Sequence, residues 1–209
     1  MPSPPRPSWL YLLIGALSLP VVKIVFRHRA TGTENVPAAG GFVLAANHWS
    51  NLDPWPLAIP FFPHRFFRFM AKTELFWFPL GWIIRSGGAF EVRRGESDEE
   101  AIATGVRLAR DGYAVVMFPE GTRRRKGVRK KHEARWRSGA ARIALTADVP
   151  LVPAGISGTE RLVRLGPLRV AYGAPIAMDD LSGLPLGEAA LTATERLREA
   201  VTALERSIA

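Results

Sequence analysis

The stretch YAVVMFPEGTR, residues 113–123, decides the fold. Its first six residues form a short apolar run that is typical of a buried strand, and the Pro-Glu-Gly that follows ends the strand. In open α/β sheets, ligands bind at the carboxyl ends of the strands. The stretch therefore predicts a central strand over residues 113–118, with the carboxylate of Glu120 and the unobstructed backbone of Gly121 beside a binding site.

Short apolar runs alternate with helical patterns on both sides of this strand. This alternation predicts an α/β fold, a sandwich around a largely buried sheet. The sequence contains no internal repeat and no long linker, and its glycines at 183–187 suggest a hinge before the last helix. Further strands are predicted over residues 41–47, 65–71, 89–92, 150–156 and 167–173, and helices are predicted after Asp53, from Thr73 to about Gly81, and over 97–112, 139–147 and 188–208.

The composition excludes several kinds of site. The chain has 209 residues, 28 Lys and Arg against 19 Asp and Glu, a formal net charge of +9, and no cysteine. This length suits one α/β domain, with or without an appendage. Without cysteine there is no disulfide framework, thiolate zinc site, iron–sulfur cluster or cysteine nucleophile. The excess positive charge indicates an anionic partner: nucleic acid, an anionic membrane or a phosphorylated substrate.

The positive charge is concentrated in one segment. Residues 123–137 hold nine basic residues and one acid, and so contribute +8 of the +9. A run of this kind is either a solvated basic loop or a patch that holds phosphate. Because it begins at Arg123, directly after Glu120 and Gly121, we expect a basic rim at the mouth of a phosphate-binding site.

The N-terminus carries a second distinctive segment. Residues 9–22 are nearly all apolar, and a basic cluster at 27–29 closes the run. A run of this length is more often buried, re-entrant or interfacial than membrane-spanning, and the nearest triplet resembling a signal-peptide cleavage site lies beyond the basic cluster. We expect residues 1–30 to be a membrane-associating helical segment of a domain formed by residues 31–209, with a full span or a buried core helix as alternatives. The basic cluster favours a location on the cytoplasmic face of the membrane.

Aromatic residues gather between Trp55 and Trp82, a segment that holds ten of the twenty in the chain. Core packing is the default explanation for any one of them. Because three basic residues are interleaved with them, the group as a whole predicts a surface that partly faces a membrane interface or lines an apolar pocket.

A histidine and an aspartate follow the strand predicted at 41–47. His48 and Asp53 are separated by four residues, which allows contact if His48 ends a strand and Asp53 begins the next helix. A histidine of near-neutral pKa can accept a proton from an alcohol, and a nearby carboxylate fixes its tautomer and stabilises the imidazolium. The pair predicts a general base, with a purely structural hydrogen bond as the alternative.

A second motif, GGAFEVR at residues 87–93, places two glycines before a predicted strand and an arginine near its far end. Two guanidinium groups suit a phosphate monoester, which each can bind in a bidentate manner. Arg93 and Arg123 are therefore candidates for binding a phosphate, and a turn followed by a surface arginine is the alternative for the motif at 87–93.

Four motifs in order resemble a known family. His-x4-Asp, Gly-x-x-Phe-x-x-Arg, Phe-Pro-Glu-Gly-Thr-Arg and the Val-Pro-Leu-Val-Pro at 149–153 resemble those of the glycerolipid acyltransferase family, and within it the 1-acyl-sn-glycerol-3-phosphate acyltransferase (PlsC) type. The segment AKTEL at 71–75, with Gly81-Trp82 after it, is also similar. The resemblance covers roughly residues 35–175.

The resemblance implies transfer of a fatty acyl chain from acyl-CoA or acyl-ACP (acyl carrier protein) to the free hydroxyl of lysophosphatidic acid, which forms phosphatidic acid in phospholipid biosynthesis. It implies the family's fold, a single-domain α/β sandwich around a mixed, largely buried sheet. It also implies that His48 is the general base and Asp53 its orienting carboxylate. The acyl donor is then a co-substrate, no cofactor or metal is expected, and the partners are a lysophospholipid acceptor and a membrane surface. The resemblance assigns substrate binding to Arg93, Glu120, Gly121, Thr122 and Arg123.

Three departures from the family pattern leave the acceptor open. Basic residues follow Arg123 where relatives often have serine, Ser138 stands where lysine is frequent, and Glu91 occupies a usually apolar position. Glycerol 3-phosphate, another lysophospholipid or a glycolipid are alternative acceptors. A basic module that binds membrane or nucleic acid and an inactive scaffold are the non-enzymatic alternatives. Nucleic acid is disfavoured because Trp136 is the one aromatic residue in the basic run that could stack on bases.

Overall fold

The computed structural model describes residues 7–72, 76–92, 98–121 and 136–209. Within these residues seven strands form one sheet, and six of them match the predicted strands to within two residues at each end. The exception is β1, whose three residues are mostly exposed and carry no apolar pattern. The strands are β1 (Arg29–Thr31), β2 (Phe42–Ala46), β3 (Phe67–Lys72), β4 (Ala89–Val92), β5 (Ala114–Met117), β6 (Leu151–Ser157) and β7 (Arg169–Tyr172).

The strand order is β1-β7-β6-β2-β5-β3-β4, so β2 lies in the middle of the sheet and is buried along its whole length. The β6–β7 pair is antiparallel and the other neighbouring pairs are parallel, which confirms the predicted mixed sheet. In the register of the sheet, Ala45 of β2 is paired with Met117 of β5 on one side and Pro153 of β6 on the other. The carboxyl ends of these three strands therefore meet at one edge.

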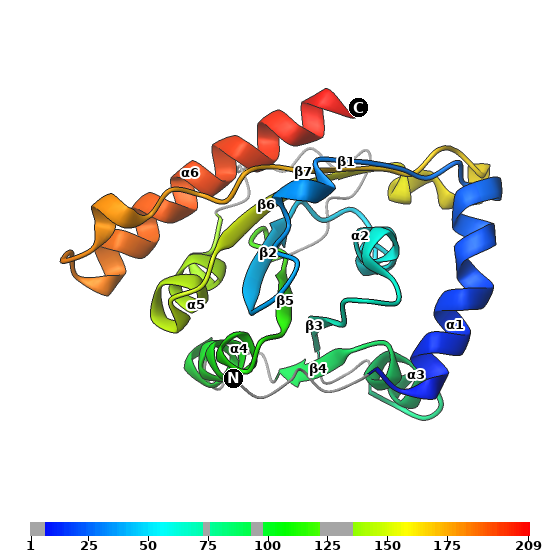
Figure 1. Cartoon of the computed structure of the whole chain (residues 1–209), viewed down its shortest axis with the longest axis horizontal. Helices are drawn as coiled ribbons and strands as arrows, with labels where there is room; N and C mark the ends of the chain where they lie inside the picture. Colours follow the sequence, from blue (N-terminus) through cyan, green and yellow to red (C-terminus); the bar gives the residue numbers. More distant parts are fainter. Residues whose placement is uncertain (1–6, 73–75, 93–97, 122–135) are drawn as a thin grey trace.

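Helices cover both faces of the sheet (Figure 1). Apolar side chains alternate along β2, so that Val43 and Ala45 face one helical layer and Phe42 and Leu44 face the other. The predicted helix at 139–147 is confirmed to the residue. The helices are α1 (Trp9–Pro20), α2 (Pro54–Ala58), α3 (Leu80–Ser86), α4 (Asp98–Arg110), α5 (Gly139–Ala147) and α6 (Leu186–Ser207), and the short π- or 3₁₀-helical turns are η1 (Val21–Val25), η2 (Thr33–Asn35), η3 (Ile59–Phe61), η5 (Thr159–Arg164) and η6 (Asp179–Leu181).

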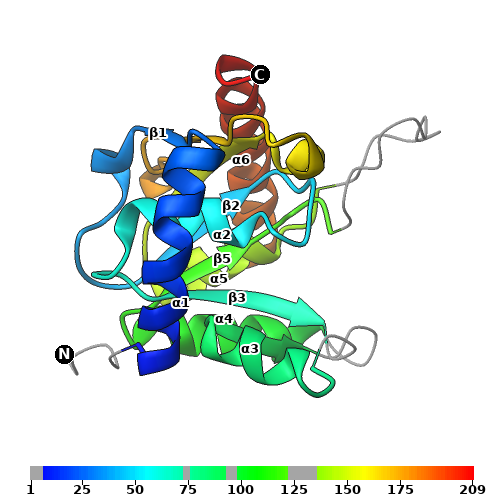
Figure 2. The ribbon, with the colours of Figure 1, turned by 90° about the vertical axis from the view of Figure 1, so that its right-hand side faces the viewer.

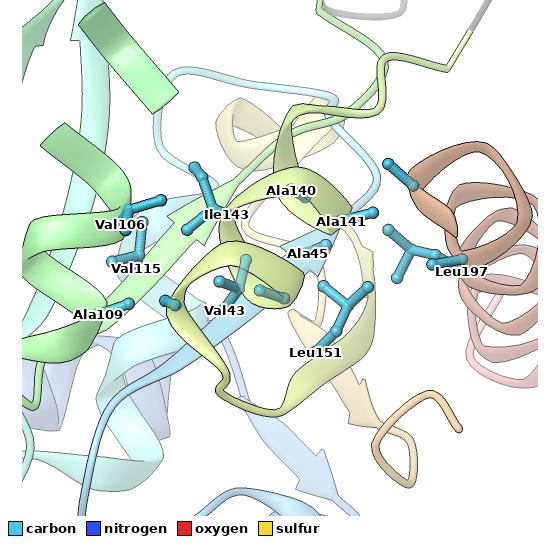
Figure 3. Close-up of a cluster of buried hydrophobic side chains, with 14 of the residues drawn as sticks. Val43, Ala45, Val106, Ala109, Val115, Ala140, Ala141, Ile143, Leu151 and Leu197 are labelled. Carbon is cyan, nitrogen blue, oxygen red and sulfur yellow. The ribbon is translucent and has the colours of Figure 1, made fainter. Parts of the chain in front are cut away.

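The first helical layer consists of α4, α5 and α6. Its core is built around α5, whose alanines allow the helix to lie close to the sheet while Ile143 fills the space toward α4. Figure 3 shows Val43 and Leu151 of the sheet beneath α5 and Leu197 of α6 at its side.

The opposite face is covered by α2 and, further out, by α1. Tyr172 is fully buried there, and its hydroxyl donates a hydrogen bond of 2.7 Å to the carbonyl of Leu57, which fixes α2 on β7. Burial raises the pKa of Tyr172 well above its usual value, so the hydroxyl remains a donor. Helix α1 packs through Tyr11 against Phe62 and Phe66, with ring centroids 5.8 and 4.8 Å apart.

The helix predicted from Thr73 to about Gly81 is wrong. Helix α3 begins at Leu80 and ends at Ser86. The physical reason is Pro79, because a proline disfavours the helical conformation in the residue before it and is best accommodated at a helix start. The helix predicted over 97–112 is confirmed as α4, and Ser97 at its predicted start lies outside the described residues.

The aromatic segment divides into two groups. Phe67 and Phe69 belong to the core, as the default explanation predicts, whereas Trp77, Phe78 and Trp82 are exposed. In the views of Figures 1 and 2, the N-terminal end of α1 lies beside α3. None of the helices in the described part of the chain combines the length and the apolar character needed to cross a membrane.

Candidate active site

The carboxyl end of β2 brings His48 and Asp53 into direct contact. The Nδ1 atom of His48 lies 2.7 Å from Oδ2 of Asp53. The aspartate side chain is fully buried, whereas 17% of the histidine side chain is exposed. The pair therefore joins a carboxylate in the protein interior to an imidazole that reaches the surface.

The chain between these two residues folds around the carboxylate. Asp53 precedes α2 at the N-cap position, yet its side chain does not cap that helix. It turns back, and Oδ2 also accepts hydrogen bonds from the backbone N–H groups of Trp49 (2.7 Å) and Ser50 (2.9 Å). Oδ1 accepts a hydrogen bond of 2.5 Å from the hydroxyl of Thr159. Such donors offset the cost of burying a carboxylate.

The end of β5 packs against the histidine. The ring of Phe118 stacks on that of His48, with centroids 4.2 Å and planes 17° apart. Two residues further on, Glu120 is buried, and the N–H of Gly121 closes a turn on the carbonyl of Phe118 at 3.0 Å. Gly121 has φ of +67°, and a Cβ atom there would lie 3.0 Å from Nε of Arg137, so both the conformation and the space favour glycine.

Asn47 holds β2 and β6 together at this edge. Its side-chain amide donates to the carbonyl of Ile156 at 2.9 Å and accepts from the N–H of the same residue at 2.8 Å. Because Asn47 is fully buried, both bonds are shielded from water. They fix the residue before His48 relative to the strand that leads to Thr159.

Several of the predicted site residues cannot be placed. Arg93, Thr122 and Arg123 lie outside the described residues, as does most of the basic run at 123–137. Of that run, Arg137 is described, and its backbone N–H donates to the carbonyl of Pro119 at 2.9 Å. The structure thus brings together His48, Asp53 and the turn that contains Glu120 and Gly121, while the two arginines remain predictions.

Sequence reasoning did not identify Asn47 or Thr159 as parts of the site. Both make their contacts over more than 100 residues of chain, which no local pattern encodes. The signal that could have identified them is the register of the sheet, because the strand predicted at 150–156 pairs with β2. A further link, from the indole Nε1 of Trp49 to Oε1 of Glu205 at 3.2 Å, ties this edge to the end of α6.

A buried carboxylate that orients a partly exposed histidine at the carboxyl edge of an α/β sheet is an arrangement suited to proton transfer from an alcohol. The family model described as Acyltransferase matches residues 27–157, a range that includes the pair and the turn after β5. The chain belongs to this family, and the resemblance found in its motifs is confirmed.

Similarity to individual relatives agrees with this family assignment. The chain is 33% identical over 181 residues to the 1-acyl-sn-glycerol-3-phosphate acyltransferase of Bacillus subtilis (strain 168), covering 84% of this chain and 86% of the relative. It is 31% identical over 155 residues to the enzyme of the same name from Streptococcus pneumoniae (strain ATCC BAA-255 / R6), covering 71% of this chain and 55% of that relative.

A solved structure is also similar. The crystal structure of the 1-acyl-sn-glycerophosphate (LPA) acyltransferase PlsC from Thermotoga maritima matches with a TM-score of 0.67 and 25% identity, over 93% of this chain and 78% of that one. The predicted fold class is confirmed by this match, and the chain is an enzyme of the acyltransferase family.

Proposed function

We propose that this protein transfers a fatty acyl chain from a thioester donor, acyl-CoA or acyl-ACP, to the free hydroxyl of lysophosphatidic acid, which yields phosphatidic acid. The observation that carries the proposal is the His48–Asp53 pair, with its 2.7 Å bond and its buried carboxylate. The relatives named above, which bear the name of this activity, support the choice of acceptor.

The geometry of the pair determines which nitrogen acts as the base. Because the Nδ1–H group of His48 donates a hydrogen bond to the carboxylate of Asp53, the basic lone pair is on Nε2. Nε2 removes the proton of the acceptor hydroxyl, the oxygen attacks the thioester carbonyl, and the carbon–sulfur bond breaks. The thiolate then receives the proton from the imidazolium, so that the products are an ester and a free thiol.

The thioester is already activated, so no covalent acyl-enzyme and no cofactor are needed if the two substrates are held side by side. Asp53 stabilises the imidazolium during the reaction. We assign the acceptor phosphate to Arg93 and Arg123 and the glycerol to Glu120, Gly121 and Thr122. Glu120 and Gly121 follow β5, the strand whose end packs on His48, which supports their place in the acceptor site.

Membrane association is part of the proposal, with residues 1–30 as the membrane-associating segment and residues 31–209 as the catalytic domain. Exposed large apolar side chains on α1 and around α3 support it, since such groups of residues mark interaction surfaces. In Figure 2, α1 crosses the face toward the viewer with α3 near its lower end. Basic residues after the apolar run support the cytoplasmic face. We call the following residues the apolar surface: Trp9, Leu13, Leu17, Phe78, Trp82 and Ile83.

An acceptor panel tests the proposal. The purified protein in detergent is incubated with labelled acyl-CoA or acyl-ACP and, in turn, with lysophosphatidic acid, glycerol 3-phosphate, another lysophospholipid and a lysoglycolipid. We expect labelled phosphatidic acid as the main product. A main product from another acceptor would reassign the substrate, and no product from any acceptor would contradict the proposed activity.

The phosphate site has its own test. Replacement of Arg123 by alanine is expected mainly to raise the KM for the phosphorylated acceptor, because a guanidinium binds the phosphate in the ground state as well as in the transition state. An unchanged KM would remove Arg123 from the phosphate site.

A further inference from the structure

The carboxylate of Asp53 has two oxygens with different surroundings. Oδ2 faces His48 and the backbone N–H groups of Trp49 and Ser50, all within the same loop. Oδ1 accepts a hydrogen bond from the hydroxyl of Thr159, which lies outside that loop. The orientation of the carboxylate, and hence of the oxygen that meets the imidazole, thus depends on a residue 106 positions further along the chain.

Thr159 is held in place independently of Asp53. It lies at the start of η5, two residues after the end of β6, and its side chain is buried. Gly158 before it has φ of +98°, and a Cβ atom at that position would lie 2.2 Å from the carbonyl oxygen of Pro167. The N–H of Gly158 also donates to Oε2 of Glu160 at 2.9 Å. The backbone turn is therefore closely defined, and the branched Thr159 side chain has little rotational freedom.

The two ends of this hydrogen bond are also fixed relative to each other. The Asn47–Ile156 pair of hydrogen bonds joins the residue before His48 to the strand that leads to Thr159. The hydroxyl thus meets Oδ1 of Asp53 through a rigid connection between β2 and β6. A valine side chain has the same shape and would fill the space, but it cannot donate a hydrogen bond to the carboxylate.

We infer that Thr159 is a positioning residue of this active site, whose hydroxyl holds Oδ1 of Asp53 so that Oδ2 stays aligned with Nδ1 of His48. It does not touch the substrates. The expected effect of Thr159 on kcat rests on the proposed acyl transfer. Its expected effect on the His48–Asp53 hydrogen bond does not depend on that function. Loss of the hydroxyl leaves a buried carboxylate oxygen poorly solvated and lets the carboxylate rotate away from the imidazole.

The test compares Thr159→Val and Thr159→Ser with a matched control. Thr194→Val is that control, because Thr194 is likewise buried and its hydroxyl donates to a backbone carbonyl, that of Ala190, inside α6. With lysophosphatidic acid and acyl-CoA, Thr159→Val is expected to lower kcat about tenfold or more and to change KM by less than about twofold. Thr159→Ser and Thr194→Val are expected to retain kcat within about twofold of the wild type.

A spectroscopic measurement separates the inference from the proposed function. The proton shared by His48 and Asp53 gives a strongly downfield ¹H NMR signal, which His48→Gln identifies by its loss. Thr159→Val is expected to shift or broaden this signal, and Thr159→Ser and Thr194→Val to preserve it. If Thr159→Val does not fold, Thr159→Ala removes the same hydroxyl and replaces it in both measurements.

Each outcome decides the inference. A kcat near the wild-type value together with an unchanged signal in Thr159→Val overturns it, and so does an equal loss in Thr159→Ser, since the hydroxyl would then not matter. If the wild type itself transfers no acyl chain, the proposed function fails, and the NMR comparison alone decides the role of Thr159.

Discussion

Two regions of the molecule depart from the usual distribution of side chains. Polar side chains are buried at the end of β2, whereas large apolar side chains are exposed on the apolar surface of α1 and α3. At the end of β2, Asn47 and Asp53 are polar and fully buried. On the apolar surface, Leu17 is 66% exposed and Phe78 is 87% exposed. Burial of polar groups and exposure of grouped apolar ones both work against folding, so each region indicates a task beyond stability.

The two regions differ in where their partners are. The described polar groups at the end of β2 find partners inside the chain, as the hydrogen bonds of Asp53 to the histidine, to two backbone N–H groups and to Thr159 show. The side chains of the apolar surface are exposed, so any partner that covers them lies outside the chain. A change in the first region should therefore alter catalysis or stability in any solution, whereas a change in the second should matter only when a membrane is present.

The largest effect is expected from His48→Ala. Loss of a positioned general base typically costs 10²- to 10⁴-fold in rate, so we expect kcat to fall about 10³-fold while the melting temperature stays near that of the wild type. The imidazole is partly exposed, so water can reach the space that its removal leaves. Acylation assays and thermal unfolding of the same preparation provide the measurement. Wild-type turnover in this variant would contradict the general-base mechanism.

The next largest effect is expected from Asn47→Ala. This change leaves the buried N–H and carbonyl of Ile156 without their side-chain partners, and each such group costs about 1–3 kcal/mol. We expect the free energy of unfolding to fall by about 3 kcal/mol in denaturant titrations, with or without lipid. Asn35→Ala is the control, because Asn35 makes a single, partly buried bond to the carbonyl of Tyr172 and should cost about 1 kcal/mol. Equal losses in the two variants would mean that the end of β2 is not specially dependent on internal partners.

The same contrast explains what the sequence could predict. Six of the seven described strands, helix α5 and the contact of His48 with Asp53 depend on patterns within a few residues, and these were predicted correctly. Thr159 meets Asp53 through the register of β2 and β6, so it was missed. Strand β1 lacks an apolar pattern because it is an exposed edge, and the helix expected to end near Gly81 failed because Pro79 delays its start.

The site was predicted less completely than the fold for a related reason. Local motifs identify which residue types are present, but the orientation of a buried carboxylate depends on donors from remote strands, such as the hydroxyl of Thr159. Arg93 and Arg123 lie outside the described residues, so their role as phosphate ligands stays a prediction.

A smaller effect, confined to membranes, is expected from Leu17→Ser on α1. Full burial of a leucine side chain contributes about 1.5–3 kcal/mol, so its loss should weaken binding to lipid vesicles about tenfold. Leu191→Ser on α6 is a matched control, because Leu191 is 65% exposed and lies in the helical layer on the other side of the sheet (Figure 1). Vesicle co-sedimentation should show the loss in Leu17→Ser alone, while both variants keep the wild-type kcat on detergent-dispersed substrate. An equal loss in both, or in neither, would mean that α1 is not the membrane-facing part.

The smallest effect is expected at His28, which lies between η1 and β1. Its Nε2 lies 3.1 Å from the carbonyl of Pro56 in α2. Burial lowers the pKa of His28 below its usual 6.5, and the charge of Lys23 lowers it further, while the hydrogen bond to Pro56 partly offsets both. Below pH 6.5 the unfolded chain then binds more protons at this residue than the folded chain does, so the stabilisation present at neutral pH is lost as the pH falls toward the folded pKa.

Melting temperatures measured from pH 8 to pH 5 should therefore fall less in His28→Gln than in the wild type, whereas the exposed His64→Gln should follow the wild type. The same slope in all three proteins would mean that the connection between the apolar N-terminal segment and α2 does not depend on a neutral His28.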